Sequence, residues 1–524
     1  MNNSALRRLP LGVFLILLLG TAYWVWFRLQ TNITLDDAFI TFRYAQDLAL
    51  GRGFVFNEGE RVLGTTTPLL TIILAFLAKF CGVQAIPVLA CVVGIVFGAL
   101  TAVLNYVIVV DLGFSRFAGY LAMAIYFATA RVLVPVVSGM ETPLVLFLMA
   151  LSLHLFIREY FTLSLVVCSL LLLTRIDGVV WSLVVLAAVL VKVRRLPRGA
   201  ILACGVILIP WAVFSITYFG GLLPHSIAAK QTIRPEPTQA VTLLAAVKSF
   251  VNWYVRPCWF PRAVFGLYLA MVCVGGFRLV CDAATRAVGM VLLAFSAGLA
   301  AFLYLGDAPH WDWYSVPSLW ANLLICAVGV EVCAELWGKR ARQGRLGAIV
   351  IGALIAGTLM LSCVWGTRGL AEYYYKWQLN QFGVLKAPGL WLRDHSPVES
   401  TVATESIGYQ GFYSRRKVID VAGLVSPAVV KLRKESRSHA EAFLKIVTQL
   451  TPDYIVLAPF QVKENRHYFG GPLFEDDSGK QMFLACYREV KRFGAPYPEI
   501  EGFSDCVIFK RESDRCVEEM RNAP

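Results

Sequence analysis

Residues 86–110 read IPVLACVVGIVFGALTAVLNYVIVV, a run of 25 residues without a charged side chain. A helix of about 20 predominantly apolar residues crosses the hydrocarbon core of a bilayer, so this run is long enough to span it. Ten further apolar runs lie along the chain, at 9–28, 117–137, 143–158, 161–175, 178–192, 200–220, 263–281, 287–305, 315–336 and 347–366. Together these runs predict a polytopic α-helical membrane protein with about 11 spans.

The composition of the whole chain supports this class. Of the 524 residues, 57% are hydrophobic and 16% are charged, whereas soluble domains carry about 25% charged residues. These values exclude an ordinary soluble enzyme, a disordered chain and a collagen-like chain. The totals of 41 Gly and 23 Pro residues favour membrane helices over a membrane barrel.

Charged residues concentrate near the C-terminus, where the last 157 positions hold 42 of the 83 charged residues. This shift predicts a transmembrane domain at 1–367 and a soluble, non-cytoplasmic domain at 368–524. Most of the net charge of +13 lies in the membrane part, which indicates basic cytoplasmic loops and not a nucleic-acid partner. Short apolar runs and one helical pattern predict a small α/β fold in the tail, with strands at 418–421, 454–457 and 506–509 and a helix at 439–450.

The orientation follows from two basic loops, 192–198 and 339–345, because Lys and Arg concentrate in cytoplasmic loops. Counting spans from these loops places the tail outside, together with the loops 29–66, 222–262 and 306–314. The apolar segment Pro68–Phe80 is short for a span and begins with Pro, so we interpret it as a juxtamembrane or re-entrant helix. If it does cross, the loop at 111–116 moves outside and one predicted span fails.

The first outer loop contains two adjacent acids, Asp36 and Asp37. Apolar residues at helical spacing around them, including Phe39 and Phe42, predict an amphipathic helix lying on the membrane. Asp36 is a candidate general base beside Arg43, and the alternative is a solvated helix start. Thr34 and Asp37 have the spacing of a capping box, so Asp37 has either a capping or a catalytic role.

Other polar residues also fall at predicted outer ends. Glu141 is a second candidate acid, or else a helix-start charge. Arg175 and Asp177 form either a substrate site or a local ion pair. Lys230 is of the residue type that binds phosphate, although a lysine at the membrane edge also reaches towards lipid headgroups. The loop 307–314, with His310 among Trp and Tyr residues, forms either an interface belt or a sugar-stacking platform.

The first outer loop carries a motif that identifies a family resemblance. Residues 36–45 read DDAFITFRYA, and residues 51–69 read GRGFVFNEGERVLGTTTPL. Together they resemble the GT-C superfamily of polyprenyl-phosphate-sugar glycosyltransferases, and most closely the terminal β-(1→2)-arabinofuranosyltransferase group of actinobacterial cell walls. Weaker matches occur at 138–144, 175–178 and 223–230, and the resemblance continues into the tail.

The resemblance implies an enzyme of the bacterial inner membrane whose active site faces the periplasmic side. Such an enzyme transfers a sugar, here possibly arabinofuranose, from a polyprenyl-phosphate donor to a cell-envelope glycan or lipid-glycan acceptor. Asp36 matches the first acid of the family motif, which acts as general base, and the other matching positions imply catalytic or substrate-binding roles for Asp37, Glu141, Arg43, Arg61, Arg175, Asp177, His225 and Lys230. His310 is a further candidate substrate ligand, in a loop that departs from the family pattern. Some members of the superfamily use a divalent cation, Mg or Mn, and the loop at 307–314 lacks an Arg that relatives often carry.

Three other functions are compatible with parts of this pattern. A protein O-glycosyltransferase of the same superfamily differs only in its acceptor. A lipid or glycan transporter would show intramembrane charges and inverted repeats, and neither is evident. A non-catalytic envelope-assembly protein is the third. In an oxidising compartment the tail cysteines Cys486 and Cys506 could form a disulfide.

Overall fold

The computed structural model describes residues 10–195, 197–232, 262–305, 312–340, 344–466, 471–500, 502–513 and 517–518. The predicted site residue His310 lies outside these residues. The chain forms two compact units, which are described separately below. The first unit comprises Met1–Ile33, Ala90–Trp211 and Val241–Glu372, and the second comprises Thr34–Leu89, Ala212–Ala240 and Tyr373–Pro524.

The first unit is helical throughout its described residues. Its helices are α1 (Leu11–Thr31), α4 (Ile86–Asp111), α5 (Arg116–Ala128), α6 (Ala130–Val137), α7 (Thr142–Ile157), α8 (Phe161–Leu172), α9 (Gly178–Val193), α10 (Arg198–Phe219), α13 (Arg262–Cys281), α14 (Arg286–Leu305), α15 (Val316–Arg340) and α16 (Gly344–Gln381). Helices α4, α10 and α16 extend into residues of the second unit.

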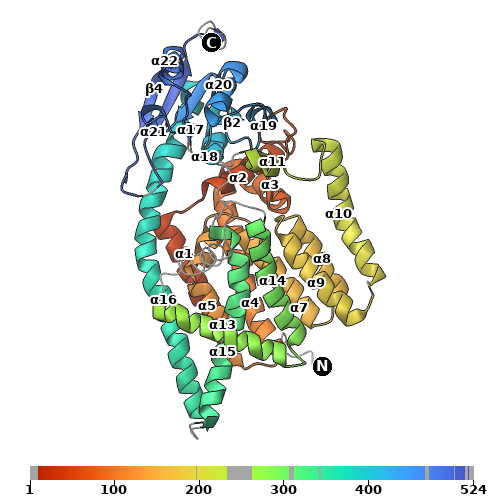
Figure 1. Ribbon diagram of the computed structural model, residues 1–524. Coiled ribbons are helices and arrows are strands. Elements are labelled where there is room, and N and C mark those ends of the chain that lie inside the picture. The colour runs from red at the N-terminus through yellow and green to blue at the C-terminus, as the bar shows by residue number, and fades with distance from the viewer. Residues whose placement is uncertain are drawn as a thin grey trace. The chain divides into compact units, whose positions relative to one another are not determined.

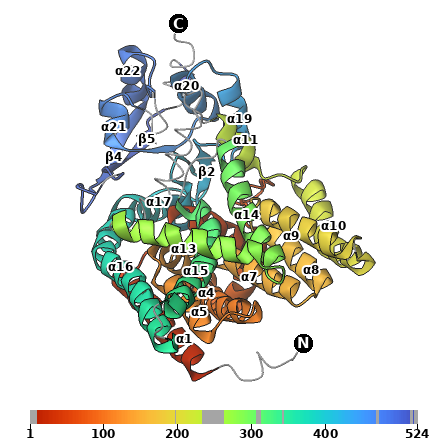
Figure 2. The same cartoon turned by 60° about the horizontal axis from the view of Figure 1, so that its bottom comes forward.

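Glycine allows two of these helices, α13 and α15, to pack backbone to backbone (Figure 2). A Cβ added at Gly275 would lie 2.0 Å from the carbonyl oxygen of Ile325, and one added at Gly329 would lie 1.9 Å from that of Met271. Small residues at helix contacts are typical of membrane proteins, where close backbone approach replaces the hydrophobic driving force.

The helices of the described residues fit a multi-pass membrane protein. Six are long and apolar enough to cross a bilayer, and the bent pair α5 and α6, which meet at 63°, makes a seventh candidate. Of the three predicted spans between 143 and 192, α7 and α9 have 16 residues each, close to the predicted lengths, whereas α8 has only 12 and ends three residues before the predicted end. At a rise of about 1.5 Å per residue, α8 covers about 18 Å of a core about 30 Å thick.

The segment predicted to be juxtamembrane or re-entrant forms α3 (Pro68–Cys81), which has 14 residues. It ends at Gly82, whose φ of +87° requires glycine, and a 3-10 turn, η1 (Val83–Ala85), then leads into α4. This helix is shorter than the candidate spans of the described chain.

Thiol labelling tests the predicted topology. In a cysteine-free background, Glu58→Cys in the first outer loop and Glu435→Cys in the tail should react with an impermeant reagent outside sealed vesicles. Arg116→Cys, in the loop after α4, should react only after permeabilisation. All three side chains are exposed, so access to the thiol is not limiting. Labelling of residues 58 and 116 from the same side would show that α3 crosses the membrane.

The second unit contains the first outer loop, a short segment after α10 and the C-terminal domain. Its helices, besides α3, are α2 (Asp36–Ala49), α11 (His225–Thr232), α17 (Ala387–His395), α18 (Ile407–Ser414), α19 (Pro427–Lys434), α20 (His439–Leu450), α21 (Pro459–Lys463) and α22 (Asp477–Cys486). A π-helical turn, η3 (Phe382–Lys386), joins α16 to α17. Figure 1 shows α17, α18, α19, α20, α21 and α22 close to the strands of the C-terminal sheet.

The C-terminal sheet has five strands in the order β2-β1-β3-β5-β4. Strand β1 (Thr401–Thr404) pairs in parallel with β2 (Lys417–Asp420) and β3 (Tyr454–Leu457), whereas β5 (Cys506–Arg511) runs antiparallel to β3 and β4 (Tyr487–Phe493). Alternate residues of β3 pack against opposite layers, as a period of two requires. Ile455 and Leu457 join the core under α19, α20 and α22, and Tyr454 and Val456 join the core under α17.

The sequence predicted α20, β2, β3 and β5, and the α/β fold of this domain is confirmed. Strands β1 and β4 were missed. The suggested pairing of Cys486 with Cys506 is wrong, because Cys506 is a free, buried thiol, although Cys486 is disulfide-bonded.

Candidate active site

The two acids of the first outer loop begin helix α2. Its N-cap is Leu35, and no side chain caps the helix start, so the predicted Thr34–Asp37 capping box is wrong. The prediction that the apolar face of this helix lies on the membrane is also wrong, because Phe39 and Phe42 are at most 1% exposed and pack on α18. The ring centroids of Phe39 and Tyr409 lie 3.9 Å apart. The apolar face of α2 is therefore covered by the C-terminal domain and not by lipid.

Asp36 caps a helix other than its own. Its Oδ1 accepts a hydrogen bond of 2.8 Å from the backbone N–H of Tyr409, in the first turn of α18, whose own N-cap Ser406 makes no side-chain cap. The approach depends on Gly408, since a Cβ there would lie 1.9 Å from the carbonyl oxygen of Asp36. A carboxylate at a helix N-terminus satisfies N–H groups that lack intrahelical partners.

The environment of Asp36 suits a general base. Burial raises the pKa of Asp36 to about 7, and the negative charge of Asp37 adds to this rise, while backbone N–H groups of Tyr409 and Gly408 oppose it. A base works best when its pKa lies near the operating pH. A carboxylate has about four lone-pair positions, so two N–H bonds leave room for a substrate hydroxyl.

Asp37 is exposed at the start of α2 and lies within the field of Lys230 on α11. Although its side chain has exposed surface, burial by surrounding protein raises the pKa of Asp37, and the Lys230 ammonium counteracts this rise. The structure thus brings together the predicted residues Asp36, Asp37 and Lys230 within the second unit.

Helix α11 also presents two buried polar atoms that make no hydrogen bond among the described residues: Nε2 of His225 and Oγ of Ser226. Ser226 is only 4% exposed. Burial lowers the pKa of His225, and the charge of Lys434 lowers it further, so the imidazole is neutral at neutral pH. Helix α11 packs against α19 (Figures 1 and 2). A buried hydroxyl and imidazole without partners carry a desolvation cost that a bound ligand would offset.

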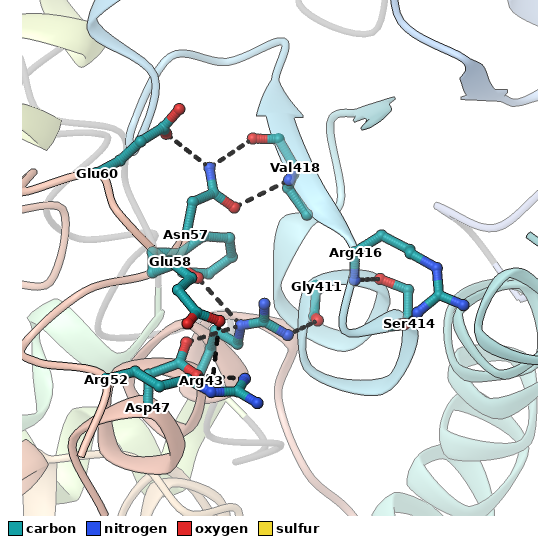
Figure 3. A network of polar contacts seen from close by, with 11 residues as sticks. Arg43, Asp47, Arg52, Asn57, Glu58, Glu60, Gly411, Ser414, Arg416 and Val418 are labelled. Carbon is teal, nitrogen blue, oxygen red and sulfur yellow. Dashed lines mark hydrogen bonds and ion pairs between the residues drawn. The ribbon is translucent and has the colours of Figure 1, made fainter. Parts of the chain in front are cut away.

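Arg43, predicted to bind substrate, instead has a structural position (Figure 3). Arg43 is 4% exposed, and its guanidinium donates to the carbonyl oxygens of Phe56, at 3.0 Å, and Gly411, at 2.8 Å. It also forms an ion pair with Asp47 at 3.2 Å. These bonds tie α2 to the following loop and to α18, because a buried guanidinium needs several acceptors.

The loop after α2 protects the edge of the C-terminal sheet (Figure 3). The side-chain amide of Asn57 accepts from the backbone N–H of Val418 and donates to its carbonyl oxygen, both at 2.9 Å. It thereby occupies the unpaired side of edge strand β2. Glu60 adds an ion pair of 2.6 Å with Lys417. Nearby, Arg61 is exposed and its guanidinium lies 4.7 Å from the ring centroid of Tyr218.

The first unit holds a separate polar cluster around Arg175, which is 3% exposed. Its guanidinium binds both carboxylate oxygens of Asp177, at 2.8 and 2.5 Å, and lies 3.7 Å from Glu141 and over the ring of Tyr314. The bidentate geometry favours the local ion-pair interpretation of Arg175 and Asp177. Glu141 is the N-cap of α7, without a side-chain cap bond.

For the divalent cation that the resemblance leaves possible, the described part of the chain contains no group of three or more His, Cys, Asp and Glu side chains that could hold a metal ion. Sequence reasoning missed Tyr409 as a site residue, and it missed the contacts of Gly408 and Ser226. Gly408 and Ser226 fall within segments that carry the family resemblance, but the bond from Tyr409 to Asp36 had no local sequence signal.

The fold is similar to that of solved membrane-protein structures. Residues 371–517 match the model of a domain of unknown function, DUF8728, and no curated protein matches the chain. The structure of ArnT from Cupriavidus metallidurans is similar to this chain, with a TM-score of 0.59 and 10% sequence identity. The similarity covers 96% of this chain and 98% of ArnT. The structure of the same ArnT bound to undecaprenyl phosphate has a TM-score of 0.55 and 12% sequence identity, and the similarity covers 95% of this chain and 97% of ArnT.

The structure of the Archaeoglobus fulgidus oligosaccharyltransferase is also similar, with a TM-score of 0.56 and 11% sequence identity. The similarity covers 86% of this chain and 70% of the oligosaccharyltransferase. These similarities confirm the predicted fold, a multi-pass helical membrane protein with a C-terminal α/β domain.

Proposed function

We propose that this protein is a membrane glycosyltransferase that transfers a sugar from a polyprenyl-phosphate donor to a hydroxyl of its acceptor. The observation that carries the proposal is the half-buried carboxylate of Asp36, held at the N-terminus of α18 beside Asp37 and Lys230. The fold adds support, since solved structures with this fold include an oligosaccharyltransferase and an ArnT bound to undecaprenyl phosphate.

In the proposed reaction, Asp36 accepts the proton of the acceptor hydroxyl. The acceptor oxygen forms a bond to the anomeric carbon of the sugar, and the bond from that carbon to the phosphate oxygen breaks. The polyprenyl phosphate leaves with the electron pair, and as a phosphate it needs no proton from an acid. The protein therefore has to supply a base and cationic or hydrogen-bonding groups for the phosphate.

The donor phosphate is proposed to bind at α11. Lys230 supplies a positive charge near Asp37, and the buried Ser226 hydroxyl and neutral His225 imidazole supply hydrogen bonds that have no partner in the described chain. Exposed Arg61 is a further phosphate ligand in this proposal, because Arg binds phosphate oxygens in a bidentate manner. Glu141 stays a candidate for orienting acceptor hydroxyls, and His310 a candidate substrate ligand.

We place the reaction on the periplasmic side of a bacterial inner membrane. The disulfide at Cys486 supports an oxidising compartment for the C-terminal domain, and the basic loops at 192–198 and 339–345 support the opposite side for those loops. The sequence resemblance favours arabinofuranose as the sugar and a cell-envelope glycan or lipid-glycan as acceptor, with a protein acceptor as the alternative.

Replacing Lys230 by Ala should weaken use of the donor more than use of the acceptor. A lost charge-assisted hydrogen bond costs about 1.5–3 kcal/mol, so the donor KM should rise about tenfold or more. Initial rates at varied donor and varied acceptor concentrations measure the two effects separately. The matched control is Lys431→Ala, an exposed lysine of α19, which should leave both constants unchanged. A change confined to the acceptor KM would assign Lys230 to the acceptor site.

Reconstitution of the purified protein in liposomes tests the function itself. Polyprenyl-phosphate sugars, each labelled in the sugar, are offered together with an extract of envelope glycans, lipid-glycans and proteins. Transfer of label to a glycan or lipid-glycan supports the proposal, and transfer to protein supports the protein acceptor. Movement of an intact donor across the bilayer without transfer would identify a transporter instead.

A further inference from the structure

The residues immediately before Asp36 are held by two side chains of the chain's C-terminal part. The side-chain oxygen of Gln378, near the end of α16, accepts the backbone N–H of Thr34 at 2.8 Å. The Tyr409 hydroxyl donates to the carbonyl oxygen of Thr34 at 3.1 Å. Both polar groups of one backbone residue, two positions from Asp36, are therefore engaged by side chains from elsewhere in the sequence.

The same two side chains also hydrogen-bond to each other, so that Gln378, Tyr409 and Thr34 are linked pairwise. The side-chain amide of Gln378 donates to the Tyr409 hydroxyl at 2.8 Å. Tyr409 is fully buried, and Gln378 and Thr34 are at most 4% exposed. Buried hydrogen bonds of this kind rigidify a site, because breaking one leaves a polar group without a partner in a medium of low dielectric.

Tyr409 reaches Asp36 from the other direction as well. Its backbone N–H donates to Oδ1 of Asp36 at 2.8 Å, and its ring lies against Phe39, one turn further along α2. One residue thus contacts the segment before the acid, the acid itself and the helix after it.

We propose that Tyr409 and Gln378 are positioning residues of the glycosyl transfer, which set the orientation of the Asp36 carboxylate through Thr34. This inference rests on the proposed function and assigns the C-terminal domain a part in building the catalytic geometry, in addition to any docking of the acceptor. A misplacement of a catalytic group by about 1 Å can lower the rate by a factor of about 100. Hydrogen bonds that hold the segment around Asp36 in place should therefore maintain the rate of transfer.

Tyr409→Phe tests the proposal, because it removes only the hydroxyl and keeps the ring against Phe39 and the N–H to Asp36. We expect kcat to fall about tenfold, with donor and acceptor KM nearly unchanged. We also expect the acid limb of the rate profile to move to higher pH. The wild-type limb should lie near pH 7, where Asp36 loses its proton, and looser N–H bonds to the carboxylate would raise that pKa further. The charged groups acting on the two acids, Asp37 itself and Lys230 from α11, are unchanged in this variant.

Tyr413→Phe is the matched control. Tyr413 lies one turn further along α18 and its ring also packs on Phe39, but its hydroxyl makes no hydrogen bond to residues 34–36 in the described structure. Its kcat and pH profile should match the wild type. Gln378→Leu should resemble Tyr409→Phe, and the double variant should be no worse than the poorer single variant, because both act through Thr34.

Three results would overturn the inference. Wild-type kcat and pH profile in Tyr409→Phe would show that the hydroxyl does not position the base. Fully additive losses in the double variant, or an equal loss in Tyr413→Phe, would show general destabilisation. Asp36→Asn measured in parallel separates the two proposals. If Asp36→Asn is inactive while Tyr409→Phe is normal, the positioning role is wrong and the proposed function stands; if Asp36→Asn transfers sugar at the wild-type rate, the positioning role and the assignment of Asp36 as the base are both wrong.

Discussion

Replacing Asp36 by Asn is expected to lower the rate of sugar transfer by at least about a hundredfold, because general-base catalysis contributes a factor of about 10²–10⁴. The substitution is selective. The Asn side-chain oxygen can still accept the N–H of Tyr409 that Oδ1 of Asp36 accepts at 2.8 Å, so the contact between α2 and α18 survives. Only the capacity to take a proton is lost. The measurement is the initial rate at saturating donor and acceptor, with donor binding measured separately and expected to be near normal.

Asp37→Asn is the internal comparison for this prediction. Asp37 makes no cap bond to its own helix, so its replacement should not lower stability. Its charge acts on Lys230, and we therefore expect a moderate loss in donor use, smaller than the loss in Asp36→Asn. Normal turnover in Asp36→Asn combined with an inactive Asp37→Asn or Glu141→Gln would place the base on a different carboxylate without changing the fold assignment.

Replacing Gly408 by Ala is expected to have the second-largest effect. The added Cβ would lie 1.9 Å from the carbonyl oxygen of Asp36 and 2.7 Å from its Oδ1. Backbone atoms cannot move aside as the end of a flexible side chain can, so α18 has to separate from the start of α2. Overpacking of this kind costs about 1–3 kcal/mol in stability, and the displaced carboxylate should cost at least about tenfold in transfer rate. Thermal unfolding in detergent and the transfer assay measure the two effects.

Gly221→Ala is the control for Gly408→Ala. Gly221 also belongs to the second unit, its φ is not positive, and a Cβ there meets no atom within 4 Å. This variant should be as stable and as active as the wild type. Unchanged stability and activity in Gly408→Ala itself would mean that the close approach of α18 to Asp36 is not needed, and would remove the structural basis of the proposed site.

Local patterns in the sequence predicted the elements that short-range physics determines. The periodic run at 439–450 and the apolar run at 454–457 form α20 and β3 with the predicted bounds. Strand β4 escaped prediction because it is a polar edge strand with only one fully buried residue, Tyr487. Strand β1, the four residues TVAT, is too short to show a clear alternation.

Long-range contacts account for the errors at the candidate site. Asp36 was recognised as a candidate base, but its cap role was not, because the N–H it accepts belongs to a residue 373 positions away. The structural contacts of Arg43 were not predicted, because its acceptor on Gly411 lies 368 positions away. The apolar face of α2 was assigned to the membrane for the same reason, since hydrophobic periodicity shows that a face is buried and not what buries it.

The most direct test of the central claim is the release of free polyprenyl phosphate from a polyprenyl-phosphate sugar in liposomes, measured with wild-type protein and Asp36→Asn side by side. Release by the wild type should depend on added acceptor and equal the sugar transferred, and release by Asp36→Asn should be at least about a hundredfold lower. Equal release by the two proteins, or no release by the wild type with any polyprenyl-phosphate sugar and acceptor extract, would contradict the central claim.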